Sequence, residues 1–272
     1  MYKDAEQSTR YKAGRRFFVY APPLKGVRPS KRKPPNPPYK GAPQWKSSVY
    51  FYWWEYLRRH EGYRQCCLNA GKGEFATLYA DFGNIHAHDD FWQWWSKEAH
   101  SELFCEPPSR PINVLDENSR LEPTLFHDTL VLTVPLEVRT AYLVARFRTV
   151  LREHALKARA ARSISRARYP VATKPVLTSL HQHLTVYDAH RANPSLKLYE
   201  LYDLVESDAG LYVSERVEGE TVAELRKLGL RYDDVLRTVR QRKANLVRRH
   251  LRIAEQYIHN AGLGQFPLRE SR

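Results

Sequence analysis

The chain has 272 residues, of which 42% are hydrophobic and 12% aromatic, so it holds enough apolar volume for a sizeable core and is not globally disordered. A formal net charge of +14 makes nucleic acid the leading class of partner, because a basic surface attracts polyanions. No apolar run approaches the length of a membrane span and no signal-like segment opens the chain, so we expect a cytoplasmic protein without membrane association.

The charge is distributed unevenly along the chain. Residues 1–45 contain 11 basic and 2 acidic residues, residues 46–145 contain 9 and 14, and residues 146–272 contain 24 and 14. Two basic ends flanking an acidic middle indicate an arm and a binding module, whereas a generally basic solvated surface is the alternative interpretation. The three cysteines form no CxxC pair, which favours a reducing compartment.

We therefore predict a mainly α fold with a minor β element and three parts. Residues 1–45 form a basic, proline-rich extended arm, residues 46–135 an aromatic-rich α(+β) domain, and residues 136–272 a basic helical domain that binds nucleic acid. Proline alternates with basic residues between 22 and 43, which prevents helix formation. Within this arm, Lys31, Arg32 and Lys33 are candidates for phosphate contacts, and a solvated linker is the equally weighted alternative.

In the middle part, Ser47 or Ser48 can cap a helix that runs to about Asn69, with aromatic residues repeating on one face. A second aromatic helix is expected after Asp89 or Asp90. We interpret these aromatic residues as core, because base-stacking surfaces usually combine aromatic with basic residues and this region is acidic. Alternating apolar residues predict one short strand over 128–134.

Apart from a short helix within residues 221–235, the last part contains four predicted helices. They cover about 137–161, about 176–190, a segment capped by Ser195, and a long helix from about Asp233 to Asn260 that ends at Gly262. The expected inner face of the long helix consists of Val235, Leu236, Val239, Leu246, Val247, Leu251, Ala254, Tyr257 and Ile258. The opposite side is crowded with arginine, and acidic residues at the spacing that would give intrahelical ion pairs are missing. This pattern favours an external polyanion.

Residues 221–235 resemble a helix-turn-helix, with a short helix, a stop at Gly229 and a second helix. Gly229 and Val235 keep the family's spacing between the turn glycine and the aliphatic residue that locks the second helix, whereas Leu225 stands where alanine is common. The resemblance implies that the second helix enters the major groove of duplex DNA. A plain helical hairpin is the alternative. The candidate nucleic-acid-binding residues in this region are Arg231, Tyr232, Arg237, Arg240, Arg242, Lys243, Arg248 and Arg249.

Two further segments, residues 48–59 and 262–267, are similar to uncharacterised accessory proteins of bacterial prophages and integrative elements. That similarity indicates a context and no activity. Our leading hypothesis is a sequence-specific or structure-specific DNA-binding protein, either a transcriptional regulator or an accessory factor of a mobile element. It needs no cofactor.

Two alternatives remain. A metal-dependent nuclease could use Asp81, His86, His88 and Asp90, because histidine and carboxylate ligands hold divalent ions. We prefer to interpret Asp89 and Asp90 as helix caps and expect a protein without catalytic activity. The other alternative is a component of a larger complex, in which the acidic, tryptophan-rich middle binds a protein partner. The sequence does not determine the oligomeric state.

Overall fold

The computed structural model describes residues 17–23, 35–96, 100–106, 130–161, 165, 167–214, 221–227 and 232–268. The chain divides into a smaller unit, residues 1–15 and 107–166, and a larger unit, residues 16–106 and 167–272. The described residues are mainly helical and include one short antiparallel sheet, so the predicted fold class is confirmed. Among the helices in the described ranges, none is both long enough and apolar enough to cross a membrane.

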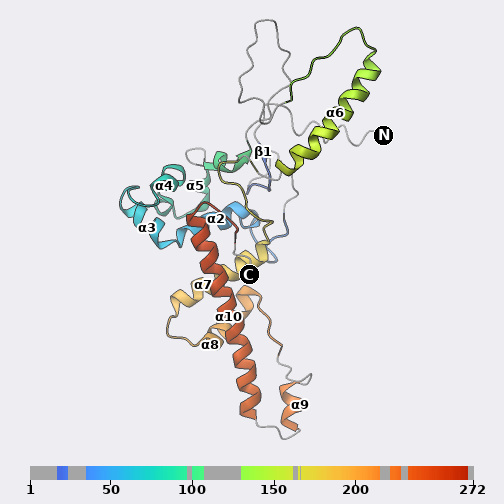
Figure 1. The fold of residues 1–272 in the computed structure, drawn as a ribbon. Coiled ribbons are helices and arrows are strands. Elements are labelled where there is room, and N and C mark those ends of the chain that lie inside the picture. Colours follow the sequence, from blue (N-terminus) through green and yellow to red (C-terminus); the bar gives the residue numbers. More distant parts are fainter. Residues whose placement is uncertain are drawn as a thin grey trace. The chain divides into compact units, whose positions relative to one another are not determined.

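The N-terminal part of the larger unit is a series of short elements (Figure 1). In chain order these are β1 (Phe17–Phe18), η2 (Gln44–Ser47), α2 (Val49–Arg58), α3 (Glu61–Leu68), α4 (Ala76–Phe82), η3 (Ile85–Ala87), α5 (Phe91–Ser96), η4 (His100–Phe104) and β2 (Cys105–Glu106). β1 pairs antiparallel with β2, with Phe17 opposite Glu106 and Phe18 opposite Cys105. The sheet therefore joins the two ends of this part of the unit.

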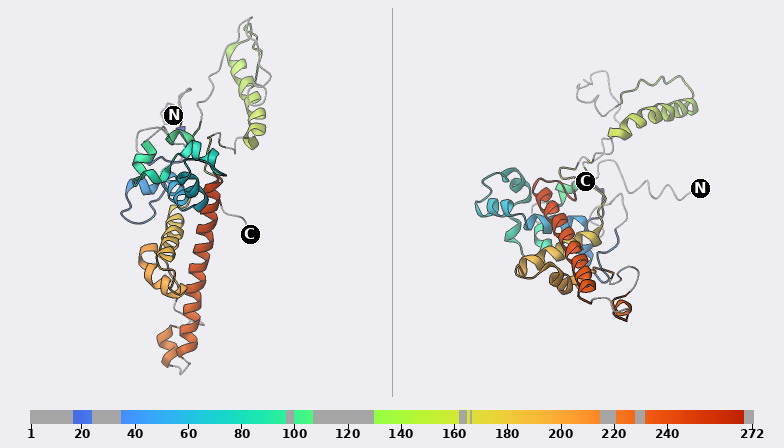
Figure 2. Two further views of the ribbon diagram at one scale, coloured as in Figure 1. Left: turned by 90° about the vertical axis from the view of Figure 1, so that its left-hand side faces the viewer. Right: turned by 60° about the horizontal axis from the view of Figure 1, so that its bottom comes forward.

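The C-terminal part consists of α7 (Leu177–Ala192), α8 (Leu198–Ala209), α9 (Val222–Lys227) and α10 (Tyr232–Gly262). α10 has 31 residues, which corresponds to about 46 Å at 1.5 Å per residue. It packs against α7, α8 and α2, and α9 lies beside its N-terminal end (Figures 1 and 2). The predicted long terminal helix ending at Gly262 is confirmed.

Aromatic side chains of α2 and α5 form the main core. In α2, Tyr50, Trp53, Trp54 and Leu57 are each at most 1% exposed, as their helical spacing predicts. Phe266, which follows α10, packs on Trp53 with 5.5 Å between ring centroids, so the segment after α10 covers part of α2. In α5, the aromatic residues Phe91, Trp94 and Trp95 are also buried. Enclosed rings of this kind are core and not a surface for stacking bases.

Two predicted caps are present. The Ser48 side chain accepts a hydrogen bond from the Tyr50 amide at the start of α2, and Asp90 accepts one from the Trp92 amide at 3.1 Å at the start of α5. Each satisfies a backbone donor that the first turn of a helix leaves unpaired. The preferred interpretation of Asp90 as a helix cap is confirmed.

A second, smaller core joins α7, α8 and α10. Its buried members are Val186, Leu201, Tyr202, Val205, Ala209, Leu211 and Val247. Because α7 and α8 hold the middle of α10 through this cluster and α2 holds its C-terminal end, the helix has a defined inner and outer face.

The smaller unit contributes α6 (Thr140–Ala161), so the helix predicted over 137–161 is confirmed. Its apolar stripe is largely exposed, with Phe147 at 40% and Leu151 at 44%. The pattern therefore predicted the helix correctly, whereas the stripe is not enclosed as a core face.

Three predictions about local structure are wrong. The single helix expected up to Asn69 is two helices, because His60 takes an extended conformation and its ring accepts a hydrogen bond from the Tyr63 amide to cap α3. Residues 130–135 form no strand, since their alternating apolar side chains are exposed and lack a pairing partner in the described ranges. Finally, α8 begins after Lys197 and not after Ser195, because the Glu200 carboxylate accepts from the Lys197 amide at 2.9 Å.

The contacts divide the chain differently from the three predicted parts. Segments 16–106 and 167–272 share one core, in which residues of α2 and α5 pack with residues of α7 and α10. The predicted 46–135 and 136–272 domains thus both contribute to the larger unit. The boundaries between the two units therefore differ from the positions at which charge and composition change along the sequence.

Candidate nucleic-acid interface

One face of α10 is anchored in both cores. Val235, Val239, Val247, Ala254 and Tyr257 are at most 9% exposed. Of the predicted inner face, Leu236, Leu246 and Leu251 are partly buried. Residues on the opposite face are consequently held outwards at spacings of three, four and seven residues.

That outer face is strongly basic. The basic residues between positions 237 and 252 are Arg237, Arg240, Arg242, Lys243, Arg248, Arg249 and Arg252, and this stretch of the sequence contains no Asp or Glu. Arg237, Arg248, Arg249 and Arg252 are all exposed. We call these four residues the α10 arginine stripe. From Arg237 to Arg252 it extends over about 22 Å along the helix axis.

The stripe has few partners within the protein. Arg248 donates to the Asn245 side chain at 2.7 Å, and no carboxylate in the described part of the chain pairs with any member of the stripe. Arg248 and Arg252 stand at i and i+4, where like charges destabilise a helix by a few tenths of a kcal/mol. The two cores can offset that cost, and an anion bound along the stripe would remove it.

Three of the predicted residues are directed toward neighbouring segments instead. Lys243 forms an ion pair with Asp203 of α8 at 2.6 Å and lies 4.9 Å from the centroid of the Tyr202 ring. Burial lowers the pKa of Lys243, but the hydrogen bond and the charge of Asp203 outweigh it and raise the pKa. Arg240 stacks over Tyr199 of α8 at 5.1 Å. These two side chains connect α10 to α8.

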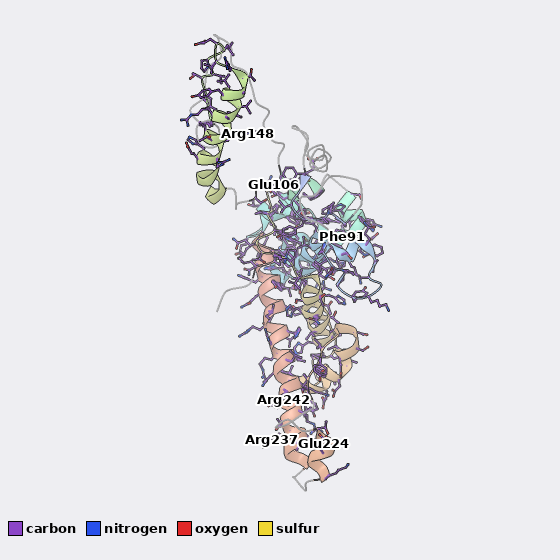
Figure 3. The ribbon with its side chains drawn as sticks, turned by 90° about the vertical axis from the view of Figure 1, so that its right-hand side faces the viewer. Phe91, Glu106, Arg148, Glu224, Arg237 and Arg242 are labelled. Carbon is purple, nitrogen blue, oxygen red and sulfur yellow. The ribbon has the colours of Figure 1, made fainter. Side chains whose placement is uncertain are left out.

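Arg242 is in the N-terminal half of α10. Its side chain is exposed and donates a hydrogen bond to the Ser214 carbonyl at 3.3 Å. Figure 3 shows Arg237 and Arg242 on this part of the helix, near Glu224 of α9. The end of the unit that carries the hairpin is therefore rich in arginine.

Some predicted site residues lie outside the described residues. These are Lys31, Arg32 and Lys33 of the arm, and Arg231 with Gly229 in the turn. Tyr232 is the first residue of α10. The two helices of the predicted hairpin are present as α9 and the start of α10, and they contact one another. The Thr221 hydroxyl accepts a hydrogen bond from the Glu224 amide, and the Glu224 carboxylate accepts one from the Thr221 amide. This reciprocal pair caps the N-terminus of α9.

The alternative metal site does not assemble around Asp81. Its carboxylate receives hydrogen bonds from the Tyr169 hydroxyl at 2.5 Å and from Arg168 at 2.7 Å, so it ties α4 to the segment before α7. Asp90 caps α5, and His86 lies on the wall of a pocket lined by arginines. Among the described residues there is no group of three or more His, Cys, Asp and Glu side chains that could hold a metal ion.

The pocket beside His86 is the feature that the sequence analysis missed. Its basic lining residues are Arg58, Arg59, Arg64 and Arg191, from α2, α3 and α7. The segment 81–90, which we considered as a metal site, contributes Asn84, His86 and Ala87 to the lining of this pocket. Only the packing of α7 against α2 brings the distant Arg191 to the other three, so no sequence spacing could reveal the set.

Comparisons of the chain with protein-family models, with curated proteins and with solved structures find no match in any of the three.

Proposed function

We propose that the protein binds duplex nucleic acid, with DNA as the favoured form, through the α10 arginine stripe and the adjoining α9–α10 hairpin. The observation that carries this proposal is the exposed, carboxylate-free stripe on a helix whose other face is buried. Lysine and arginine placed near phosphates release condensed counterions, which supplies most of the affinity of such surfaces. As a transcriptional regulator or an accessory factor of a mobile element, the protein would use this affinity to reside on DNA.

The anchoring of α10 supports the proposal energetically. Arginines on a helix fixed by two cores lose little backbone freedom when they bind, so less of the interaction free energy is spent on ordering. Arg240 and Lys243 contribute indirectly, by holding α10 on α8. The four members of the stripe are the residues that we expect to contact phosphates.

The test is a titration of fluorescently labelled duplex DNA with the full chain, read by anisotropy over a range of salt concentrations. Replacing Arg237, Arg248 and Arg252 together with alanine should lower the slope of log affinity against log salt by about three, one for each lost phosphate contact. At 0.1 M salt the same change corresponds to roughly a hundredfold or greater loss of affinity.

A matched control is available in α6. Replacing Arg146, Arg148 and Arg152, which are also exposed, removes the same charge from another basic helix. Equal losses from the two triple variants would mean that general basicity and not the stripe causes binding, and a wild-type chain that fails to bind duplex in low salt would refute the proposal.

The hairpin makes a further distinction possible. A helix fits the major groove of B-form DNA but not the deep, narrow major groove of duplex RNA. If the start of α10 enters the groove, duplex DNA should compete more strongly than duplex RNA of the same length. Equal competition would restrict the interaction to the phosphate backbone.

A further inference from the structure

A pocket of about 670 Å³ lies between α2, α3, η3 and α7, within the larger unit. The lining residues that bear charge or hydrogen-bonding groups include Glu55, Arg58, Arg59, Arg64, Asn84, His86, Asp188 and Arg191. Its volume falls in the range of about 300–1,000 Å³ that small-molecule sites occupy. The pocket is on different elements from the α10 arginine stripe.

Arg59 is a structural part of the wall. Its Nε and Nη2 atoms donate to the two carboxylate oxygens of Asp188, both at 2.6 Å, and its Nη1 donates to the Glu55 carboxylate at 2.5 Å and carbonyl at 2.6 Å. Burial disfavours the Arg59 charge, but these bonds outweigh it and raise the pKa. Because its nitrogens are occupied by this network, Arg59 joins α2 to α7 and is not the group that would bind a ligand.

The other three arginines are available. Arg58 stacks over the buried Trp54 ring at 4.5 Å, which positions its guanidinium without neutralising it. Within the described ranges, the one ion pair of Arg64 is a loose contact with Glu61 at 3.9 Å, between two exposed side chains. No carboxylate in the part of the chain that the structure describes pairs with Arg58 or Arg191.

The loop that follows α4 forms another part of the pocket lining, through Asn84 and His86. Gly83 ends α4 with φ 63° and ψ −163°, a conformation that favours glycine, and the Tyr63 hydroxyl donates to its carbonyl at 2.7 Å. Asn84 then caps η3 by accepting from the His86 amide at 3.0 Å. The His86 Nε2 atom is enclosed and has no hydrogen-bond partner in the described ranges. The loop therefore contributes polar groups to the same pocket lining as the arginines.

We propose that this pocket binds a phosphate monoester, with Arg58, Arg64 and Arg191 as the residues that contact the phosphate. Four arginines against two carboxylates leave the lining with a net charge of +2. A phosphate monoester carries about −1.5 to −2 at pH 7 and accepts several hydrogen bonds, so its charge balances the lining, whereas a phosphodiester would supply only about half of that charge.

The site can be tested by isothermal titration of the full chain with adenosine 5′-monophosphate, inorganic phosphate and adenosine. We expect the two phosphates to bind and adenosine not to bind. Arg64→Ala and Arg191→Ala should each weaken binding at least tenfold, and both residues are exposed, so folding should be preserved. Arg252→Ala on α10 is the matched control and should leave binding unchanged.

The imidazole of His86 offers a second readout. Burial, and then the charges of Arg58 and Arg64, lower its pKa. A phosphate bound between those arginines would cancel their effect, so an NMR titration should show the pKa of His86 rising when inorganic phosphate is present. No binding of either phosphate, or binding that both pocket variants leave intact, would overturn the proposal.

The source of the monoester is decided by the same assay with short duplexes that carry a 5′-phosphate or a 5′-hydroxyl. Tighter binding of the phosphorylated end, lost in Arg191→Ala, would identify a nucleic-acid terminus as the ligand. Equal binding of the two duplexes, together with binding of the nucleotide, would identify a small phosphate ester. The pocket variants leave the α10 stripe intact, so failure of one proposal is distinguishable from failure of the other.

Discussion

The helices α6 and α10 share one sequence pattern, because each combines a stripe of apolar residues with several arginines. They differ in whether other segments cover the apolar stripe. In α10 the apolar stripe is covered by α7, α8 and α2, and its member Ile253 is 5% exposed. In α6 the corresponding side chains remain open, with Leu151 at 44%. An amphipathic pattern therefore predicts a helix, whereas burial depends on whether other segments cover the stripe.

This difference has a consequence for function. A helix held on one side can direct charged side chains outwards at fixed positions, and that is the property on which the proposed interface depends. The density of arginine is similar, with four in the 22 residues of α6 and six in the 31 residues of α10, but the apolar stripe of α6 gives it no comparable anchor within the described residues. Charge content alone would not distinguish the two helices.

The largest effect that tests this comparison concerns the two apolar stripes. Ile253→Ala in α10 removes buried methyl and methylene groups and should lower the free energy of unfolding by about 2–4 kcal/mol. Leu151→Ala in α6 should cost less than about 1 kcal/mol, because the side chain is already partly in water. Urea unfolding of both variants followed by circular dichroism measures these values, and similar losses would show that the stripe of α6 is also covered.

A smaller effect concerns a polar pair on the buried face of α10. The Nδ1 atoms of His250 and of His183 on α7 are 2.8 Å apart, so one ring donates a hydrogen bond to the other. Burial, and then the charge of Arg249, lowers the pKa of His250 from 6.5 to about 4. The unfolded chain consequently takes up a proton that the folded chain excludes.

Stability should therefore be complete above pH 6.5 and decrease as the pH falls toward 4. We expect a loss on the order of 2 kcal/mol over this window, after allowance for solvent screening. His250→Gln keeps a hydrogen-bonding group but cannot titrate, so its unfolding free energy should depend less on pH than that of the wild type. Parallel pH profiles for the two proteins would contradict this assignment.

The smallest effect lies at the border between the inner and outer faces of α10. Lys243 and Asp203 form an ion pair in which the Asp203 side chain is 53% exposed. A double-mutant cycle with Lys243→Met and Asp203→Asn should give a coupling energy below about 1 kcal/mol. Binding of duplex DNA to the α10 arginine stripe should persist in Lys243→Met, because in the wild type the ammonium group is already occupied by the ion pair with Asp203. A strong loss of duplex affinity would return Lys243 to the contact surface.

Much of the helical architecture could be predicted because its signals are local. The spacing of Trp53 and Trp54 in α2 and of Val239 and Val247 in α10 marked faces that are buried. The capping roles of Ser48 and Asp90 also require only neighbouring backbone amides. The break at His60 was missed, since a histidine ring that caps a helix is not among the usual capping residues.

Non-local arrangements were not predictable in the same way. The strand expected over 128–134 failed because a strand needs a partner, and the observed sheet pairs β1 with β2 from segments far apart in the chain. The pocket arginines were missed for the same reason, as Arg191 reaches Arg58 and Arg64 only through packing of α7 on α2.

The amino-acid sequence by itself determined a mainly helical chain, an aromatic core and a basic C-terminal helix, because helix periodicity, capping and charge are properties of neighbouring residues. Only the tertiary structure decided which arginines from distant segments line one pocket. It also decided that Lys243 pairs with Asp203 and that Arg240, although exposed, lies over Tyr199 of α8. The physical reason is that burial and convergence depend on contacts between residues distant in sequence, which no local pattern encodes.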